Sequence, residues 1–282
     1  MIAVVDYQKG NLKSVERGLI AAGGEAFITA DASEIAKADA IVLPGVGAFA
    51  DAAATMCELG QMDVIRERVR AGVPFLGICL GEHLMFEHGV EGAPEGNPAC
   101  GLGLLPGTVV AMPRCDAQGK AFKVPHVGWN TIEIPACSGG AAVPPRGEGG
   151  GNAVLSSGGA GGGAARSSAA KRGLFEHGAF PGSAPQVGSE LAFPDSTPQP
   201  GSDLAFACPL FDGIAPGEYF YFTHSYIAPT GSHTIAETTH SVRFTSAVQY
   251  GDRAFGVQFH PEKSSDAGAR VLANFVAIAA RG

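Results

Sequence analysis

A strand that runs into a glycine turn and then a helix is the pattern that most constrains this chain. The mostly apolar residues 73–78 have the length of a buried strand, and they end in the sequence Gly-Ile-Cys-Leu-Gly at 77–81. A helix-like run over 82–87 follows at once. The glycines allow a tight bend around Cys79, as in a nucleophile elbow, and the helix N-terminus favours a thiolate there. The pentapeptide alone does not exclude a cysteine that merely packs in the core.

A histidine follows a second strand, far away in the sequence. Residues 254–259 have the composition of a buried strand, so we expect His260 at its C-terminal end, where open α/β sheets place their sites. Glu262 follows at a spacing that lets it hold one imidazole nitrogen while the other faces a thiol. Alone, His-Pro-Glu is more often a surface turn. Paired with Cys79, it predicts a Cys-His-Glu triad.

Short apolar strands alternate with helices in the first part of the chain, which predicts parallel strands. Strands are expected at residues 1–6, 26–29 and 40–43, and helices at 14–22, 50–59 and 62–71. Residues 246–250 and 254–259 are expected to be antiparallel across a turn, and a helix over 267–280 closes the chain. The sequence therefore predicts an α/β fold with a mostly parallel central sheet and antiparallel strands near the C-terminus.

Composition argues against several classes of protein. The formal net charge of the 282 residues is −8, without the basic patch that a nucleic-acid surface needs. No apolar run approaches the length needed to cross a bilayer, and no signal peptide is present, so we expect a soluble cytoplasmic protein. The cysteines show no metal-ligand spacing, which predicts free thiols, no metal site and no cofactor. They are Cys57, Cys79, Cys100, Cys115, Cys137 and Cys208.

Residues 138 to about 205 differ sharply from the rest of the chain. They consist mainly of Gly, Ala, Ser and Pro. Such sequence buries too little apolar area to offset the entropy of ordering it. We therefore expect a mostly disordered insertion rather than a second domain.

The Cys79 turn and the later His260 and Glu262, in that order, resemble the class I glutamine amidotransferases. Finer motifs are similar to those of the glutaminase subunits of imidazole glycerol phosphate synthases. These are the opening Asp6–Val15, the Gly-Leu-Gly-Leu-Leu-Pro-Gly run at 101–107, and Pro-His-Val-Gly-Trp-Asn at 125–130. The resemblance covers roughly 1–135 and 209–282. It implies one amidotransferase domain over 1–282, interrupted by the insertion, with a flavodoxin-like three-layer sandwich fold.

The resemblance also implies roles for further residues. The loop Pro44-Gly45-Val46-Gly47, otherwise typical of an ordinary strand-to-helix turn, matches the family's oxyanion loop, so Val46 and Leu80 are oxyanion candidates. The implied substrate contacts are Gly45, Gly47, His83, Glu91, His224, Ser225 and Tyr226. Glu91 matches a carboxylate that binds the ammonium group of glutamine, although an exposed loop acid is an equal alternative. The family usually has Met-Gln where this chain has Glu82 and His83.

The activity that the resemblance implies is hydrolysis of L-glutamine, with ammonia passing to a partner. That partner is a (β/α)8-barrel cyclase subunit, in a heterodimer, which makes imidazole glycerol phosphate and an aminoimidazole carboxamide ribotide in histidine biosynthesis. The implied docking residues are Pro125, His126, Trp129, Asn130, Tyr221 and Lys263. By its chemistry alone, Trp129 is more often a core residue. The alternatives are a Cys-His γ-glutamyl hydrolase and a non-catalytic binding subunit.

Overall fold

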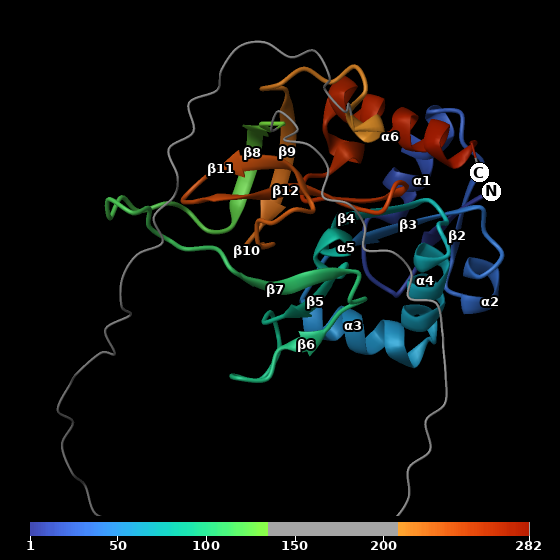
Figure 1. Ribbon diagram of the computed structural model, residues 1–282, viewed down its shortest axis with the longest axis horizontal. Helices are drawn as coiled ribbons and strands as arrows, with labels where there is room; N and C mark the ends of the chain where they lie inside the picture. Colours follow the sequence, from blue (N-terminus) through green and yellow to red (C-terminus); the bar gives the residue numbers. More distant parts are fainter. Residues whose placement is uncertain (135–207, 282) are drawn as a thin grey trace, which may run out of the picture. The chain divides into compact units, whose positions relative to one another are not determined.

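A seven-stranded sheet forms the centre of the molecule, in the order β11-β12-β13-β4-β3-β1-β2 (Figure 1). The computed structural model describes residues 1–134 and 208–281, so the insertion expected at 138–205 and Cys137 lie outside the described residues. The strands of this sheet are β1 (Ile2–Val5), β2 (Ala26–Thr29), β3 (Ala40–Gly45), β4 (Phe75–Cys79), β11 (Thr234–Thr239), β12 (Arg243–Tyr250) and β13 (Ala254–Val257).

The sheet is parallel from β2 to β13 and antiparallel beyond it. Parallel pairing joins β2-β1-β3-β4-β13, which is the strand order of flavodoxin-like folds. β12 runs antiparallel to both β13 and β11. Every residue of β1, β3, β4 and β13 is buried, as expected for parallel strands covered on both faces. The predicted sheet, including the antiparallel strands near the C-terminus, is confirmed.

Helices cover both faces of the sheet, because successive strand side chains point to opposite sides. On one face, Ile2 and Val4 pack in a core with α1 (Leu12–Ala21) and α6 (Ser265–Ala279). On the other face, Val5 belongs to a second core with α3 (Phe49–Glu58) and α4 (Gln61–Arg70). These layers are visible in Figure 1. The α/β sandwich expected from the sequence is therefore observed.

Smaller elements flank the main sheet. A four-stranded sheet has the order β10-β7-β5-β6, and β8 pairs with β9. These strands are β5 (Phe86–Gly89), β6 (Ala99–Cys100), β7 (Leu105–Ala111), β8 (His126–Thr131), β9 (Tyr219–His224) and β10 (Tyr226–Ile227). The short helices are α2 (Ala32–Ile35), α5 (Leu80–His83), η1 (Pro209–Phe211) and η2 (Pro261–Lys263).

The helix expected over 82–87 is wrong in its extent. Helix α5 ends at His83, and β5 begins at Phe86, which pairs with Leu105 of β7. The chain is buried without interruption from Leu80 to Phe86, so no polar face marks where the helix ends. The polar Glu82 and His83 lie inside the protein rather than on its surface.

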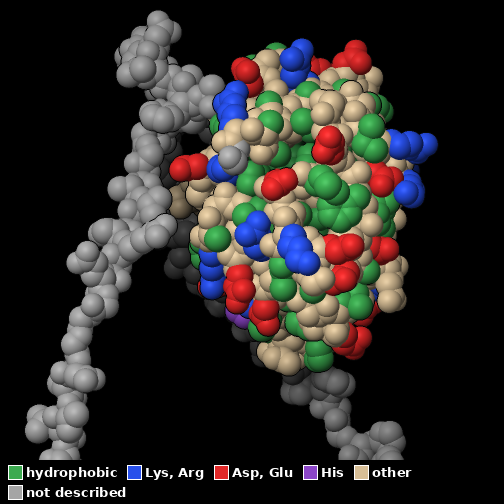
Figure 2. Space-filling view, turned by 90° about the vertical axis from the view of Figure 1, so that its right-hand side faces the viewer, with side chains coloured by type: hydrophobic (Ala, Val, Ile, Leu, Met, Phe, Trp, Pro, Cys, Tyr) green, Lys and Arg blue, Asp and Glu red, His purple; other side chains and the backbone are tan. Residues whose placement is uncertain are grey.

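The surface of the described residues carries both signs of charge. On the face shown in Figure 2, Lys and Arg side chains are interspersed with Asp and Glu. None of the helices in 1–134 and 208–281 has the length and apolar character required to span a membrane.

Candidate active site

Cys79 occupies a strained turn between β4 and α5. Its backbone has φ 54° and ψ −107°, a conformation that L-residues rarely adopt and that costs about 1–3 kcal/mol. The neighbouring glycines make the turn possible. A Cβ atom on Gly81 would lie 1.8 Å from the carbonyl oxygen of Leu43, and one on Gly77 would lie 2.5 Å from that of Gly81. The tight elbow expected from the sequence is therefore present.

Strand register brings His260 to the same edge of the sheet. β13 and β4 are adjacent and parallel, with Val257 opposite Ile78, so the chain leaving β13 passes beside Cys79. Nδ1 of His260 lies 2.9 Å from Oε1 of Glu262, and these side chains are 4% and 2% exposed. This pairing leaves Nε2 for Cys79. The structure thus brings together the three residues that the sequence had placed in a triad.

His260 holds its proton more strongly than an ordinary histidine. Burial alone would lower the pKa of His260, but its interactions with Cys79 and with the hydrogen-bonded Glu262 together raise it to about 9. At neutral pH the imidazole is therefore a cation between two acidic groups. An imidazolium therefore interacts with the Cys79 side chain.

Two further polar groups lie near the sulfur of Cys79. Nε2 of Gln258 is 3.7 Å from Sγ, and the carbonyl oxygen of Thr223 is 3.9 Å from it. The Gln258 side chain also meets His83, whose Nε2 lies 2.6 Å from Oε1. Burial lowers the pKa of His83 to about 4, despite the hydrogen bond to Gln258, so this imidazole is neutral at pH 7. Sequence reasoning missed Gln258 and Thr223, because both follow or lie within apparent core strands.

The segment proposed to bind an oxyanion begins within β3, which includes Pro44 and Gly45, and continues past the end of that strand through Val46 and Gly47. Gly45 packs so closely against Tyr7 that a Cβ atom there would lie 2.2 Å from the tyrosine oxygen. Burial and the charge of Cys79 raise the pKa of Tyr7, opposed by the nearby Val46 N–H, so the hydroxyl stays protonated. The Val46 side chain is 42% exposed. Leu80 begins α5, where the first N–H groups of a helix have no intrahelical partner.

Glu82 lies within α5, close to Cys79, yet it has no partner. The residue is fully buried, and neither carboxyl oxygen has a hydrogen bond within the described residues. Burial first, and then the charge of Cys79, raise the pKa of Glu82 well above its ordinary value. The side chain fills the space above Gly256, where a Cβ atom would lie 2.8 Å from Cγ of Glu82.

His224, Ser225 and Tyr226 mark the end of β9, the strand that also carries Thr223. Nδ1 of His224 donates to the carbonyl oxygen of Tyr226 at 2.8 Å, so its Nε2 accepts from Nδ1 of His126 at 3.0 Å. Burial lowers the pKa of both histidines, to about 4 for His126, and both are neutral at pH 7. This chain of bonds links β8 to β9.

Four of the residues proposed for partner docking lie on the β8–β9 pair, whereas Pro125 precedes β8 and Lys263 ends η2. Trp129 is 53% exposed and lies opposite Tyr221, with ring centroids 6.1 Å apart. Pro125 and Lys263 are also exposed, whereas His126 is buried. Nδ2 of Asn130 donates to the carbonyl oxygen of Thr239 at 3.0 Å. An exposed Trp contradicts the alternative of core packing.

Glu91 lies at the N-terminus of α3, next to the loop that carries Gly47. Its backbone oxygen accepts from the Ala50 N–H at 3.0 Å, and its side chain accepts from the Phe49 N–H. Helix α3 has no side-chain cap from its own N-cap residue, Ala48. Burial raises the pKa of Glu91, and the contact with Phe49 partly offsets the rise. Glu91 therefore has a structural partner in addition to its proposed ligand.

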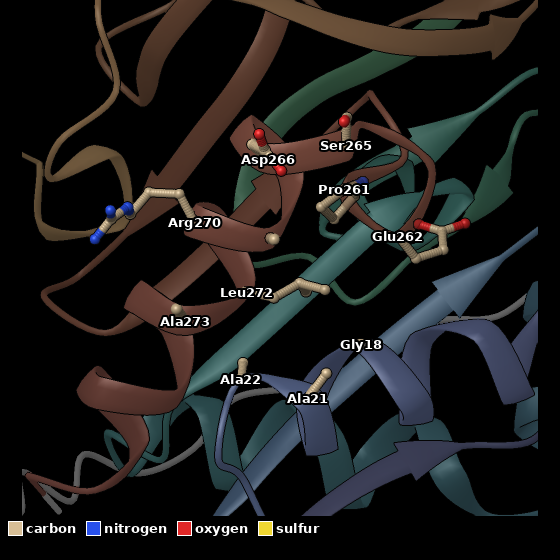
Figure 3. A pocket seen from close by; sticks show the side chains of 11 residues that line it. Gly18, Ala21, Ala22, Pro261, Glu262, Ser265, Asp266, Arg270, Leu272 and Ala273 are labelled. Carbon is tan, nitrogen blue, oxygen red and sulfur yellow. The ribbon is translucent and has the colours of Figure 1, made fainter.

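A groove lies between α1 and α6, and Glu262 is one of the residues that line it (Figure 3). Small residues of α1, including Gly18 and Ala21, form one wall, and α6 forms the other. Cys79 does not line this groove. Across 1–134 and 208–281, no group of three or more His, Cys, Asp or Glu side chains is arranged to hold a metal ion.

Comparison with known proteins identifies sequence relatives over nearly the whole chain. The family model for glutamine amidotransferase class-I matches residues 3–135 and 192–279. The imidazole glycerol phosphate synthase subunit HisH of Moorella thermoacetica is 35% identical over 276 residues, covering 97% of this chain and 93% of that protein. The protein of the same name from Rhodopirellula baltica is 33% identical over 277 residues, covering 98% and 96%.

Solved structures share the fold at low sequence identity. A glutamine amidotransferase crystal structure superposes with a TM-score of 0.56 at 16% identity, covering 99% of this chain and all of that one. The PurLQS structure from Thermotoga maritima gives a TM-score of 0.54 at 14% identity, covering 98% of this chain and 97% of that one. These structures support the α/β architecture.

Proposed function

Because the chain belongs to the class-I glutamine amidotransferase family, we propose that it is the glutaminase subunit of an imidazole glycerol phosphate synthase. It hydrolyses L-glutamine to L-glutamate and ammonia in the biosynthesis of histidine. The observation that carries this proposal is the buried His260, which contacts Glu262 at 2.9 Å and interacts with Cys79 at the turn after β4.

The reaction begins with the thiolate of Cys79. It attacks the side-chain carboxamide carbon of glutamine, forming a C–S bond and a negatively charged oxygen. His260, protonated at neutral pH, gives its proton to the departing nitrogen, and ammonia leaves when the C–N bond breaks. Glu262 keeps the imidazole oriented through Nδ1. A glutamyl thioester remains on the enzyme.

Water completes the cycle. His260 removes a proton from water as it attacks the thioester, and cleavage of the C–S bond releases glutamate and regenerates the thiolate. The N–H groups of Val46 and Leu80 are the proposed donors to the oxyanion in both halves. Gly45, Gly47, His83, Glu91, His224, Ser225 and Tyr226 remain the proposed substrate contacts.

The proposed partner is a (β/α)8-barrel cyclase subunit that receives the ammonia. It would use the ammonia to form imidazole glycerol phosphate and an aminoimidazole carboxamide ribotide. The exposed Trp129 and its neighbour Tyr221 support docking on the β8–β9 pair, since exposed aromatic residues are frequent at interfaces. Pro125, His126, Asn130 and Lys263 complete the proposed face. We also propose a cytoplasmic location and one amidotransferase domain on both sides of residues 138–205.

Glutamate release from glutamine tests this function directly. We expect the purified chain to release glutamate, and the cyclase subunit with its bound ribonucleotide to increase the rate. Cys79→Ala should abolish release under both conditions, because it removes the nucleophile. A wild-type chain that releases no glutamate with or without the cyclase would refute the glutaminase proposal. Release that the cyclase leaves unchanged would refute the proposed partnership alone.

A further inference from the structure

Gln258 links Cys79 to His83 through the two ends of its side-chain amide. Nε2 lies 3.7 Å from Sγ of Cys79, and Oε1 lies 2.6 Å from Nε2 of His83. Gln258 is 0% exposed, and the other two residues are 7% and 3% exposed. Its backbone N–H donates to the carbonyl oxygen of Ser246 at 3.0 Å, which fixes the start of the side chain beside β12. A buried amide needs partners, and these two side chains supply them.

The charge on the sulfur determines which way the amide faces. A thiolate only accepts hydrogen bonds, so it favours the amide NH2 over the carbonyl oxygen. The carbonyl of Gln258 then faces His83 and requires a donor. A neutral imidazole carries one N–H, and the 2.6 Å contact places that proton on Nε2. The three side chains therefore form a chain of hydrogen bonds in which His83 donates to Gln258 and Gln258 donates to Cys79.

We propose that Gln258 is a further catalytic residue, which donates a hydrogen bond to the Cys79 thiolate, and that His83 is the positioning residue that holds its amide. Assigning the sulfur as the attacking atom rests on the proposed glutaminase function. The hydrogen bond from Gln258 to Cys79 does not depend on that function, because it is a contact of the structure. In this arrangement His83, which the sequence analysis assigned to substrate binding, acts on the Cys79 nucleophile through Gln258.

Several other groups also influence the sulfur. The titratable or charged ones that face Cys79 are Tyr7 after β1, Glu82 on α5, and His260 with Glu262 after β13. The Tyr7 hydroxyl stays protonated up to pH 9, and His83 is neutral above about pH 4. All of these groups other than His83 are present in every variant used below. Differences between variants therefore isolate the contribution of the Gln258 amide.

The rate of Cys79 alkylation by iodoacetamide, measured from pH 5 to pH 9, tests the proposal without glutamine turnover. Mass spectrometry of the Cys79 peptide gives the rate, and the exposed Cys57 on α3 serves as a reference in the same tube. The midpoint of the profile reports stabilisation of the thiolate. The plateau at high pH reports access of the reagent, so the two effects separate. Because alkylation requires no glutamine turnover, its outcome distinguishes failure of this inference from failure of the proposed function.

We expect Gln258→Met to raise the midpoint by about one pH unit, which lowers reactivity about tenfold on the acidic side. His83→Phe should raise the midpoint as well, which should lower reactivity about threefold on the acidic side. His83→Gln, which retains an N–H donor, should stay within about twofold of the wild type. An unchanged midpoint in Gln258→Met, or equal shifts in the two His83 variants, would overturn the proposal. If Gln258→Met fails to fold, the two His83 variants decide.

Discussion

Two buried glutamates flank Cys79 in contrasting surroundings. Oε1 of Glu262 lies 2.9 Å from Nδ1 of His260, and the Glu262 side chain is 2% exposed. Glu82 is 0% exposed and has no hydrogen-bond partner for either oxygen in the described part of the chain. Both side chains are buried, but only Glu262 has the His260 imidazolium beside it. Glu262 therefore has a hydrogen-bonded, charged partner that Glu82 lacks, although both side chains lie near the same thiol.

Replacing each of the two glutamates by glutamine should give the largest difference between the two sites. Glu262→Gln should lower kcat for glutamine about 1000-fold, or about 4 kcal/mol, because the imidazole loses its charged, orienting acceptor. Glu82→Gln should leave kcat within about threefold, since Glu82 contacts no group that moves a proton. Steady-state glutamate release with the cyclase present measures both. Equal losses in the two variants would show that Glu262 has no special role.

Glu82 should instead affect stability, in a pH-dependent way. Because burial raises its folded-state pKa above the unfolded value, its contribution is most favourable below about pH 4.5 and is lost as pH rises. Glu82→Met should therefore stabilise the protein by up to about 3 kcal/mol at pH 7, with a smaller gain at pH 5. Urea unfolding at both pH values measures the difference.

Glu82→Gln is the matched control for that effect. The amide does not titrate, so the pH-dependent part of the gain should persist in Glu82→Gln. The part that comes from removing an unpartnered polar group should appear only in Glu82→Met. A gain in Glu82→Met that is the same at pH 5 and pH 7 would contradict ionisation as its cause.

The sequence predicted the elements that local patterns control. Apolar strands and glycine turns identified β4, its strained Cys79 and the parallel sheet, because periodicity and backbone freedom are local properties. The extent of α5 was wrong, since the helix-like run expected over 82–87 ends at His83. The burial of Glu82 and His83 depends on packing against distant β13. Polarity alone cannot reveal that.

Gln258 was missed for a related reason. In the sequence it stands at the end of an apolar strand and has no motif of its own. Its partners, Cys79 and His83, are 179 and 175 positions away. Only the register between β13 and β4 brings them together. Pairing between side chains this far apart leaves no pattern that a single sequence displays.

Removing the Cys79 thiol tests how much that group contributes to the pKa of His260. Interaction with Cys79 raises the pKa of His260, and the charge of Cys79 also raises the pKa of Glu82. Cys79→Ala should therefore lower the pKa of His260 from about 9 by about one unit, or about 1.4 kcal/mol. Titration of the imidazole C–H resonances by NMR measures it. A pKa that stays near 9 would assign the rise to Glu262 alone.

Glu91 provides an intermediate case with the smallest expected effect. It is partly buried, and its side chain accepts from the Phe49 N–H at the start of α3. Glu91→Gln keeps an acceptor oxygen but removes the charge that the helix N-terminus favours, so stability should fall by about 0.5 kcal/mol. If capping is its only role, KM for glutamine should stay unchanged, whereas the proposed ammonium contact requires KM to rise. Urea unfolding and glutamine kinetics on the same variant separate the two roles. An unchanged free energy of unfolding together with a raised KM would show that Glu91 contacts the substrate and does not stabilise the N-terminus of α3.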